Sequence, residues 1–143
     1  MNIFTATTIL IFLTDLASCA QNKKEITAIE FTSLSRAYYE QVLITPDSLC
    51  NGTREAGGEI KTTCRPTTTA EWNELLNSLN GVSISEMGKL KSPSMKRAYD
   101  GALHSSLRLT TKDNQSWNHS FDDDDPHEQL RPLLIAIRKL ESN

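Results

Sequence analysis

Residues 103–121 read LHSSLRLTTKDNQSWNHSF, and this stretch decides the fold. Up to Thr111, apolar and polar side chains alternate, which predicts a strand with one solvated face. The next three residues are typical of a hairpin turn with Asn114 in the left-handed conformation, which pairs Thr111 with Gln115. This register places the large side chains of both strands on one face: Leu107, Leu109, Trp117, His119 and Phe121.

Other segments with regular patterns complete the predicted fold. Strands are expected over residues 26–31 and 38–45, where β-branched and aromatic residues recur at period two. One helix is expected after the capping box Thr68-Thr69-Ala70-Glu71, and a second is expected to open at Asp125-Pro126 with Asp125 as its N-cap. The fold class is therefore α+β, an antiparallel sheet of about four to six strands with two main helices packed on one face.

An apolar run from Ile3 to Leu16 precedes a cysteine, and it is too short to span a bilayer as a mature helix. Leu16-Ala17-Ser18-Cys19 resembles the lipobox of bacterial lipoproteins. The resemblance implies a signal peptide over residues 1–18 and a diacylglyceryl group, with further acylation such as palmitate, on Cys19. A tether over residues 19–25 and a single α+β domain over residues 26–143 would follow.

The resemblance also implies a location. Ala20, directly after the cysteine, favours the outer membrane by family analogy, with the domain facing the periplasm or the cell surface. Several acyl chains would make this anchoring effectively permanent. The run departs from the usual pattern because it lacks Lys and Arg at its start and carries Asp15 near its end, so a plain secretory signal and a buried N-terminal strand remain alternatives.

Three segments of the domain also resemble small uncharacterised lipoproteins of the Bacteroidota. They are Ser35-Arg36-Ala37-Tyr38, Ala98-Tyr99-Asp100-Gly101-Ala102 and Phe121-Asp122-Asp123. This resemblance carries no activity that could be assigned to the chain.

Cys50 and Cys64 form an even pair in a chain predicted to be exported, which favours a disulfide. If Ala56-Gly57-Gly58 is a hairpin loop, Glu55 pairs with Glu59, and counting outward brings Cys50 opposite Cys64. Cα atoms of opposed residues lie about 4.5 to 5.5 Å apart, which is within disulfide reach. Two free thiols and half of a metal site are the alternatives.

The composition excludes some partners. The 143 residues include 15 basic and 18 acidic side chains, for a net charge of −3, which gives no basic surface for nucleic acid. We expect no nucleic-acid partner and no cofactor, and contact with the membrane through the N-terminal lipid anchor.

Two segments mix arginine with tyrosine, a composition enriched at protein interfaces. They are Arg36-Ala37-Tyr38-Tyr39 and Lys96-Arg97-Ala98-Tyr99-Asp100. The candidate partner-binding residues are Arg36, Tyr38, Tyr39, Arg97 and Tyr99. The alternative is a pair of strand connections, each with a solvated arginine and a core tyrosine.

Acidic and histidine residues are interpreted as structural, so no metal ligands are predicted. The run of four aspartates over residues 122–125 matches no calcium loop and is explained by capping of the last helix. The predicted register puts His104 and His119 on opposite faces, which opposes a zinc site shared with His127.

No catalytic residues are predicted, because the chain has neither a Gly-x-Ser-x-Gly nor a Ser-x-x-Lys motif. The sequence thus predicts a lipid-anchored cell-envelope protein, a non-catalytic binding or interaction module for an envelope protein or cell-wall component. A small envelope hydrolase or metal-dependent enzyme is the alternative.

Overall fold

A computed structural model describes residues 26–142 of the chain. The predicted signal peptide, Cys19 and the tether lie outside the described residues. The strands are β1 (Ile26–Leu34), β2 (Tyr38–Ile44), β3 (Ser48–Glu55), β4 (Lys61–Pro66), β5 (His104–Thr111) and β6 (Ser116–Asp122). The helices are α2 (Thr69–Ser78) and α3 (Arg131–Glu141), with 3₁₀ turns η2 (Ile84–Lys89), η3 (Lys96–Tyr99) and η4 (Glu128–Leu130).

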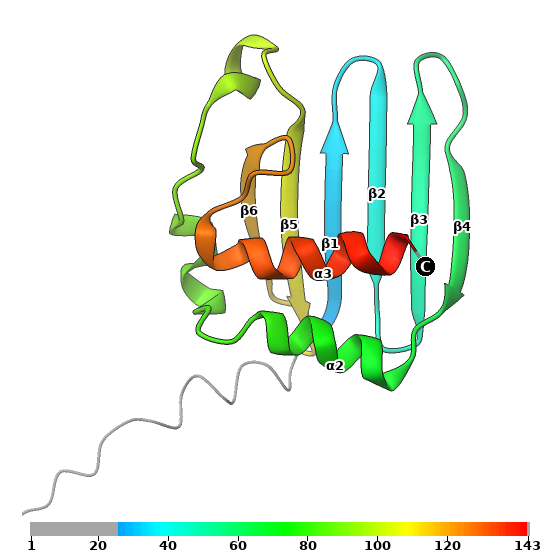
Figure 1. Cartoon of the computed structure of the whole chain (residues 1–143), viewed down its shortest axis with the longest axis vertical. Coiled ribbons are helices and arrows are strands. Elements are labelled where there is room, and N and C mark those ends of the chain that lie inside the picture. Colours follow the sequence, from blue (N-terminus) through cyan, green and yellow to red (C-terminus); the bar gives the residue numbers. More distant parts are fainter. Residues whose placement is uncertain (1–25, 143) are drawn as a thin grey trace, which may run out of the picture.

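The six strands form one antiparallel sheet in the order β4-β3-β2-β1-β5-β6, which confirms the predicted α+β class. Figure 1 shows α3 crossing in front of the sheet and α2 lying near its lower end. The chain enters β1 at that lower end, whereas the β1–β2 connection and η3 lie at the upper end. None of the helices within residues 26–142 is long and apolar enough to cross a membrane.

Both predicted hairpin registers are confirmed. Thr111 donates its backbone N–H to the carbonyl of Gln115 at 3.0 Å, and Asn114 has a left-handed φ of 60°. Cys50 lies opposite Cys64, and Gly57 supplies the positive φ of the β3–β4 turn. These registers follow from turn chemistry and strand alternation, both of which are local properties of the chain.

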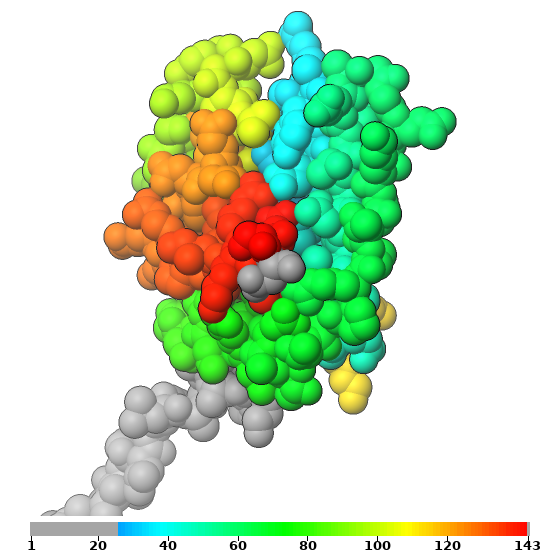
Figure 2. Space-filling model, turned by 45° about the vertical axis from the view of Figure 1, so that its right-hand side comes forward, coloured from blue at the N-terminus to red at the C-terminus, as the bar shows by residue number. Residues whose placement is uncertain are grey.

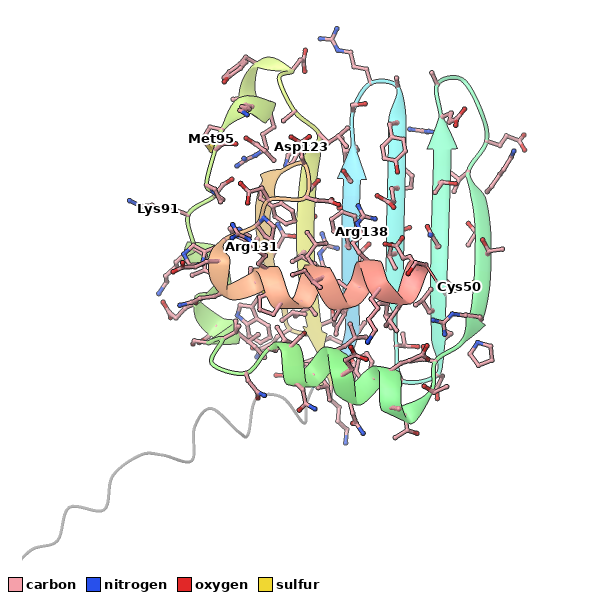
Figure 3. All side chains as sticks on the ribbon, viewed as in Figure 1. Cys50, Lys91, Met95, Asp123, Arg131 and Arg138 are labelled. Atoms are coloured by element: carbon pink, nitrogen blue, oxygen red, sulfur yellow. A yellow bond between two sulfur atoms is a disulfide. The ribbon has the colours of Figure 1, made fainter. Side chains whose placement is uncertain are left out.

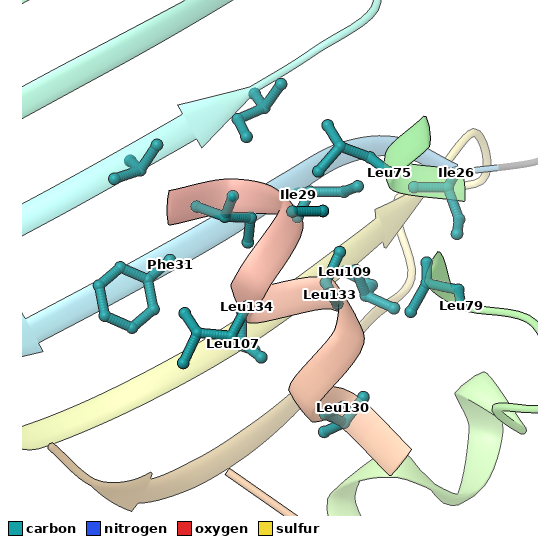
Figure 4. Packing of buried hydrophobic residues seen from close by; sticks show 14 of the residues in the cluster. Ile26, Ile29, Phe31, Leu75, Leu79, Leu107, Leu109, Leu130, Leu133 and Leu134 are labelled. Carbon is teal, nitrogen blue, oxygen red and sulfur yellow. The ribbon is translucent and has the colours of Figure 1, made fainter. Parts of the chain in front are cut away.

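The central pairing joins β1 to β5, which are far apart in the sequence. It places Ile29 opposite Leu109 and Phe31 opposite Leu107, and all four side chains are fully buried. Figure 4 shows these residues clustered with Leu133 and Leu134 of α3, and the same hydrophobic cluster includes Leu75 and Leu79 from the α2 region. Burial of each such side chain stabilises the fold by about 1.5 to 3 kcal/mol, so this cluster is the core of the domain.

The opposite face of the sheet carries polar side chains, and we call it the polar face. Its central residues are Glu30, Thr32, Ser106 and Arg108. The Thr32 and Ser106 hydroxyls are 2.7 Å apart, and Arg108 pairs with Glu30 at 3.4 Å. These cross-strand contacts satisfy polar groups on the exposed side of β1 and β5.

The capping box predicted at the start of the first helix is confirmed. Thr68 is the N-cap of α2, its hydroxyl accepts from the Glu71 amide, and the Glu71 carboxylate accepts from the Thr68 amide. Arg65 also binds this carboxylate, and together these bonds lower the pKa of Glu71 to about 2. The cap therefore fixes the junction between β4 and α2.

The predicted start of the last helix is wrong. Asp125 is not its N-cap, because the chain first makes the 3₁₀ turn η4 with His127 as its cap. The helix α3 begins at Arg131, with Pro132 in its first turn. Asp125 instead pairs with Arg131 at 3.0 Å, so its carboxylate is committed to a side chain and not to helix amides.

Candidate functional site

A cleft at the upper end of the sheet gathers the two segments that mix arginine with tyrosine. Arg36, in the β1–β2 connection, donates to the Asp100 carboxylate at 2.9 Å, and Asp100 directly follows η3. The cleft beside this ion pair has a volume of about 550 Å³. We call it the turn cleft, and its lining is Leu34, Ser35, Arg36, Ala37, Arg97, Asp100, Ala102 and His104.

The ion pair across the turn cleft is weak. The side chains of Arg36 and Asp100 are 91% and 73% exposed, and a pair this open contributes less than about 1 kcal/mol. Both charges therefore stay accessible to a partner that offers a better geometry. Tyr99, next to Asp100, is also largely exposed and stands at the same end of the domain.

The turn that carries Tyr99 and Asp100 is tightly built. Asp100 has a left-handed φ of 57°, and the Gly101 amide donates to the Lys96 carbonyl at 2.9 Å. A Cβ atom at Gly101 would lie 2.8 Å from the Tyr99 ring and 3.2 Å from the Lys96 carbonyl oxygen, so a larger residue here would require the exposed Tyr99 side chain to move.

Arg97 links the wall of the turn cleft to β6. Its guanidinium binds the buried Asp122 carboxylate at 2.6 Å and also reaches the Ser92 hydroxyl and the Ser94 carbonyl. Only 14% of the Arg97 side chain is exposed. Of the predicted partner-binding residues, Arg97 thus holds the cleft together and presents little of its charge to a partner.

Asp122 is the acceptor that organises this wall. It receives bonds from the Ser94 hydroxyl, from the Lys96 and Arg97 amides, and from the Arg97 guanidinium. Burial alone would raise the pKa of Asp122, but these donors outweigh it and hold the pKa well below its usual range. The carboxylate therefore stays ionised and fixes the 92–97 segment against β6.

Tyr38 and Tyr39 point to opposite faces of β2, so the sheet separates them. Tyr39 lies on the polar face, where the guanidinium of Arg54 sits 5.6 Å from its ring centre. Tyr38 lies on the other face near Glu40, and burial together with this carboxylate raises its pKa. Both rings are half-buried, so a partner could contact only part of each ring.

A charged cluster centred on Arg138, which Figure 3 labels, was not predicted from the sequence. Arg138 of α3 binds the buried Glu40 at 2.6 and 3.0 Å, and it also pairs with Asp124 and Glu141. Its guanidinium lies 4.5 Å from the ring centre of Phe31. The sequence shows Arg138 only as a basic residue near the end of the last helix. It gives no sign of Glu40 and Asp124, the partners from β2 and the aspartate run.

This cluster borders a second, acidic cleft of about 430 Å³. It is lined by Tyr38, Glu40, Leu103, Asp123, Asp124 and Arg138. Arg138 is fully engaged by its three carboxylates, and their bonds hold its pKa above the usual range even though burial opposes this. The cluster ties α3 to β2 and to the aspartate run, which is a structural role.

The aspartate run makes separate contacts at each position. Asp122 binds Arg97, Asp123 accepts from the Leu103 amide, Asp124 binds Arg138 and Asp125 binds Arg131. The explanation by helix capping is therefore wrong, because the carboxylates are drawn to partners elsewhere in the fold. Within residues 26–142, no group of three His, Cys, Asp or Glu side chains is placed to hold a metal ion.

The histidines occupy different environments. His104 is exposed on the polar face and His119 is buried among core residues, so the predicted division between faces is confirmed. The Nε2 atom of His119 accepts from the His127 amide at 3.2 Å, and burial together with His127 lowers the pKa of His119. No serine or threonine hydroxyl in residues 26–142 is hydrogen-bonded to a histidine.

Cys50 and Cys64 form the predicted disulfide, with Cα atoms 4.1 Å apart. The bond lies across β3 and β4 at one end of the sheet order. It belongs to neither cleft.

Comparison with known proteins adds no family: no family model, curated protein or solved structure matches this chain. The geometry defines the class of protein as a small α+β domain with a charged cleft at one end of an antiparallel sheet.

Proposed function

We propose that this protein is a lipid-anchored protein of the bacterial cell envelope, in the outer membrane, whose folded domain is a non-catalytic binding module. The turn cleft is its binding site, and the partner is an envelope protein or a cell-wall component. The observation that carries this proposal is the Arg36–Asp100 contact, which joins both segments of interface composition around one cleft.

The direction of β1 supports this proposal. Ile26, the first described residue, starts the strand at the lower end of the sheet, and Leu34 ends it beside the turn cleft. Nine residues of strand extend for about 27 to 30 Å. A lipid anchor on the N-terminal side would therefore leave the turn cleft at the end of the domain remote from the point of attachment.

The chemistry in and beside the cleft supports a binding role. Arg36 and Asp100 line the cleft with opposite charges, the exposed ring of Tyr99 is next to Asp100 in the chain, and arginine and tyrosine are enriched among the residues that contribute most to binding at protein interfaces. We also infer that α2 and α3 pack on the same face of the sheet. In that arrangement the polar face remains open as a second surface that a partner could contact.

Lipid attachment is tested with cells that express the chain and grow on labelled palmitate. We expect label on the wild-type protein and none on the Cys19→Ala variant, because the thiol is the predicted site of acylation. A Cys50→Ala/Cys64→Ala variant serves as the control and should keep its label. Label that persists in Cys19→Ala, or that is absent from the wild type, would overturn the anchor.

The binding site is tested by photocrosslinking in intact cells from two exposed alanines. A photoreactive residue at Ala37 lies in the turn cleft, whereas one at Ala70 lies on α2 near the lower end of the sheet. We expect a crosslinked product from Ala37 only. Adding Arg36→Ala and Tyr99→Ala should reduce it about tenfold, because truncating an interface arginine or tyrosine often removes more than 1 kcal/mol of binding energy.

An Arg131→Ala variant is the matched control, since Arg131 also forms an ion pair that is more than half exposed, and this pair lies outside the cleft. It should leave the product from Ala37 unchanged. Equal crosslinking from Ala37 and Ala70, or a product that survives both Arg36→Ala and Tyr99→Ala, would remove the turn cleft as the binding site.

A further inference from the structure

The two edges of the sheet are built differently. Along β6, the turn η2 covers the edge, and a Cβ atom on Gly88 would lie 3.5 Å from the Asn118 carbonyl oxygen. The other edge is β4, and five of its six residues are exposed. Figure 2 turns this side forward and shows the β3–β4 hairpin at the outer margin of the domain. Exposed strand edges present unpaired backbone groups, and most proteins shield them.

The hydrogen-bond pattern identifies which backbone groups of β4 point outward. The Thr67 amide donates to the Asp47 carbonyl at 3.2 Å, so these opposed residues are a hydrogen-bonded pair. Such pairs alternate along an antiparallel ladder, which makes Cys50 and Cys64 a non-hydrogen-bonded pair. Their Cα distance of 4.1 Å agrees, because hydrogen-bonded pairs are about 5.5 Å apart. The N–H and C=O groups of Thr62 and Cys64 therefore point away from β3.

Pro66 and Arg65 end this row of groups. Pro66 is the next outward position, but proline has no N–H, and the Arg65 guanidinium donates to the Pro66 carbonyl at 3.1 Å. The open edge is therefore limited to the backbone groups of Thr62 and Cys64. The disulfide holds Cys64 to β3, so these groups are already in the strand conformation before any partner arrives.

The side chains beside the edge differ between the two faces. On the face that carries the helices, the exposed Lys61 forms no ion pair with any residue of the described chain. On the polar face, the disulfide lies beside exposed Leu43, and the Cγ2 atom of exposed Ile60 lies 3.5 Å from where a Gly52 Cβ would stand. One face of the edge thus carries the unpaired cation of Lys61, and the other carries the disulfide, Leu43 and Ile60 beside the Thr62 side chain.

We propose that an extended segment of another protein adds to β4 as a seventh strand, with carboxylates on one face and apolar side chains on the other. Its backbone pairs with Thr62 and Cys64. A carboxylate meets Lys61, and apolar side chains extend the strip formed by Leu43, the disulfide and Ile60. Successive side chains of a strand point to opposite faces, so a segment in which acidic and apolar residues alternate would place its carboxylates on one face and its apolar side chains on the other.

A second copy of this chain fits the edge poorly. Only one two-fold antiparallel register uses the outward groups of both Thr62 and Cys64 in each copy, and it pairs Thr62 of one copy with Cys64 of the other. In this register Lys61 of each copy lies directly opposite Arg65 of the other copy. Like charges opposed across strands are destabilising, so the charge pattern favours an acidic partner over self-association.

The proposal is tested by NMR with the ¹⁵N-labelled full-length chain in detergent. The probe is an end-capped ten-residue peptide in which glutamate alternates with valine, and the control peptide carries lysine in place of glutamate. We expect amide shifts confined to β4 and its neighbours with the acidic peptide, and at least tenfold weaker binding of the lysine peptide. No shifts at millimolar acidic peptide, or equal shifts with both peptides, would overturn the proposal.

Two variants test the contacts separately. Thr62→Pro removes an outward N–H while leaving the bonds between β3 and β4 in place, and we expect it to weaken binding at least tenfold. Lys61→Glu should weaken binding about two- to fivefold, the range for an exposed ion pair, whereas the control Lys112→Glu in the β5–β6 turn should not. Unchanged binding by both Thr62→Pro and Lys61→Glu, or concentration-dependent dimerisation through β4 without peptide, would refute the acidic partner.

Discussion

Replacing Asp122 with asparagine is expected to lower the free energy of unfolding by about 3 kcal/mol. The substitution leaves the Arg97 guanidinium buried without its carboxylate and replaces an acceptor oxygen with an amide that cannot accept. The 92–97 segment loses its attachment to β6, so the wall of the turn cleft should loosen as well. Urea unfolding followed by tryptophan fluorescence measures the change, and amide hydrogen exchange should rise at Lys96 and Arg97.

Asp125→Asn is the matched control from the same aspartate run. The Asp125–Arg131 pair is more than half exposed on both sides, so its loss should cost less than about 1 kcal/mol. If the two variants are equally stable, Asp122 does not organise the cleft wall.

The pH dependence of stability provides a second readout for Asp122. Its folded-state pKa is depressed, so its contribution is fully present above the unfolded value of about 3.9 and is lost as the pH falls toward the folded pKa. Wild type should therefore lose stability below about pH 4 more steeply than Asp122→Asn. Parallel acid-unfolding curves would contradict this assignment.

Removing the disulfide with Cys50→Ala and Cys64→Ala is expected to lower the free energy of unfolding by about 3 kcal/mol. The cysteines are 14 residues apart, and the bond limits the freedom of the unfolded chain. The exposed strand β4 buries little surface of its own, so the bond is also a main constraint on its position. Chemical denaturation with and without reductant measures the effect.

Reduced wild type is the control for the two alanine substitutions. It should match the double variant, and the double variant should not respond to reductant. A loss below about 1 kcal/mol, with the variant folded normally, would show that β3 and the Arg65–Glu71 contact alone hold β4 in place.

The predicted part of the fold is the part that nearby residues encode. The Thr111–Gln115 and Cys50–Cys64 registers and the Thr68 capping box were each predictable, because turn chemistry, side-chain alternation and cap spacing act within a few residues. The predicted start of the last helix was wrong, because the Asp125 carboxylate binds the Arg131 side chain and does not cap the helix amides.

The candidate site was predictable only in part. Arg36 and Tyr99 carried a compositional signal, but nothing near either residue indicated that the Arg36–Asp100 contact would bring the two segments together. The Arg138 cluster gave no comparable signal, because its carboxylates come from β2, from the aspartate run and from α3 itself. Such partners depend on which strands become neighbours.

By itself the sequence determined the first helix, the two hairpins and the disulfide, because each depends on chain neighbours or on a turn that sets the register. Only the tertiary structure decided the β1–β5 pairing, the turn cleft, the open β4 edge and the partner of each aspartate. These features depend on closing long loops around one hydrophobic core, and the free energy of that closure is shared by the whole domain.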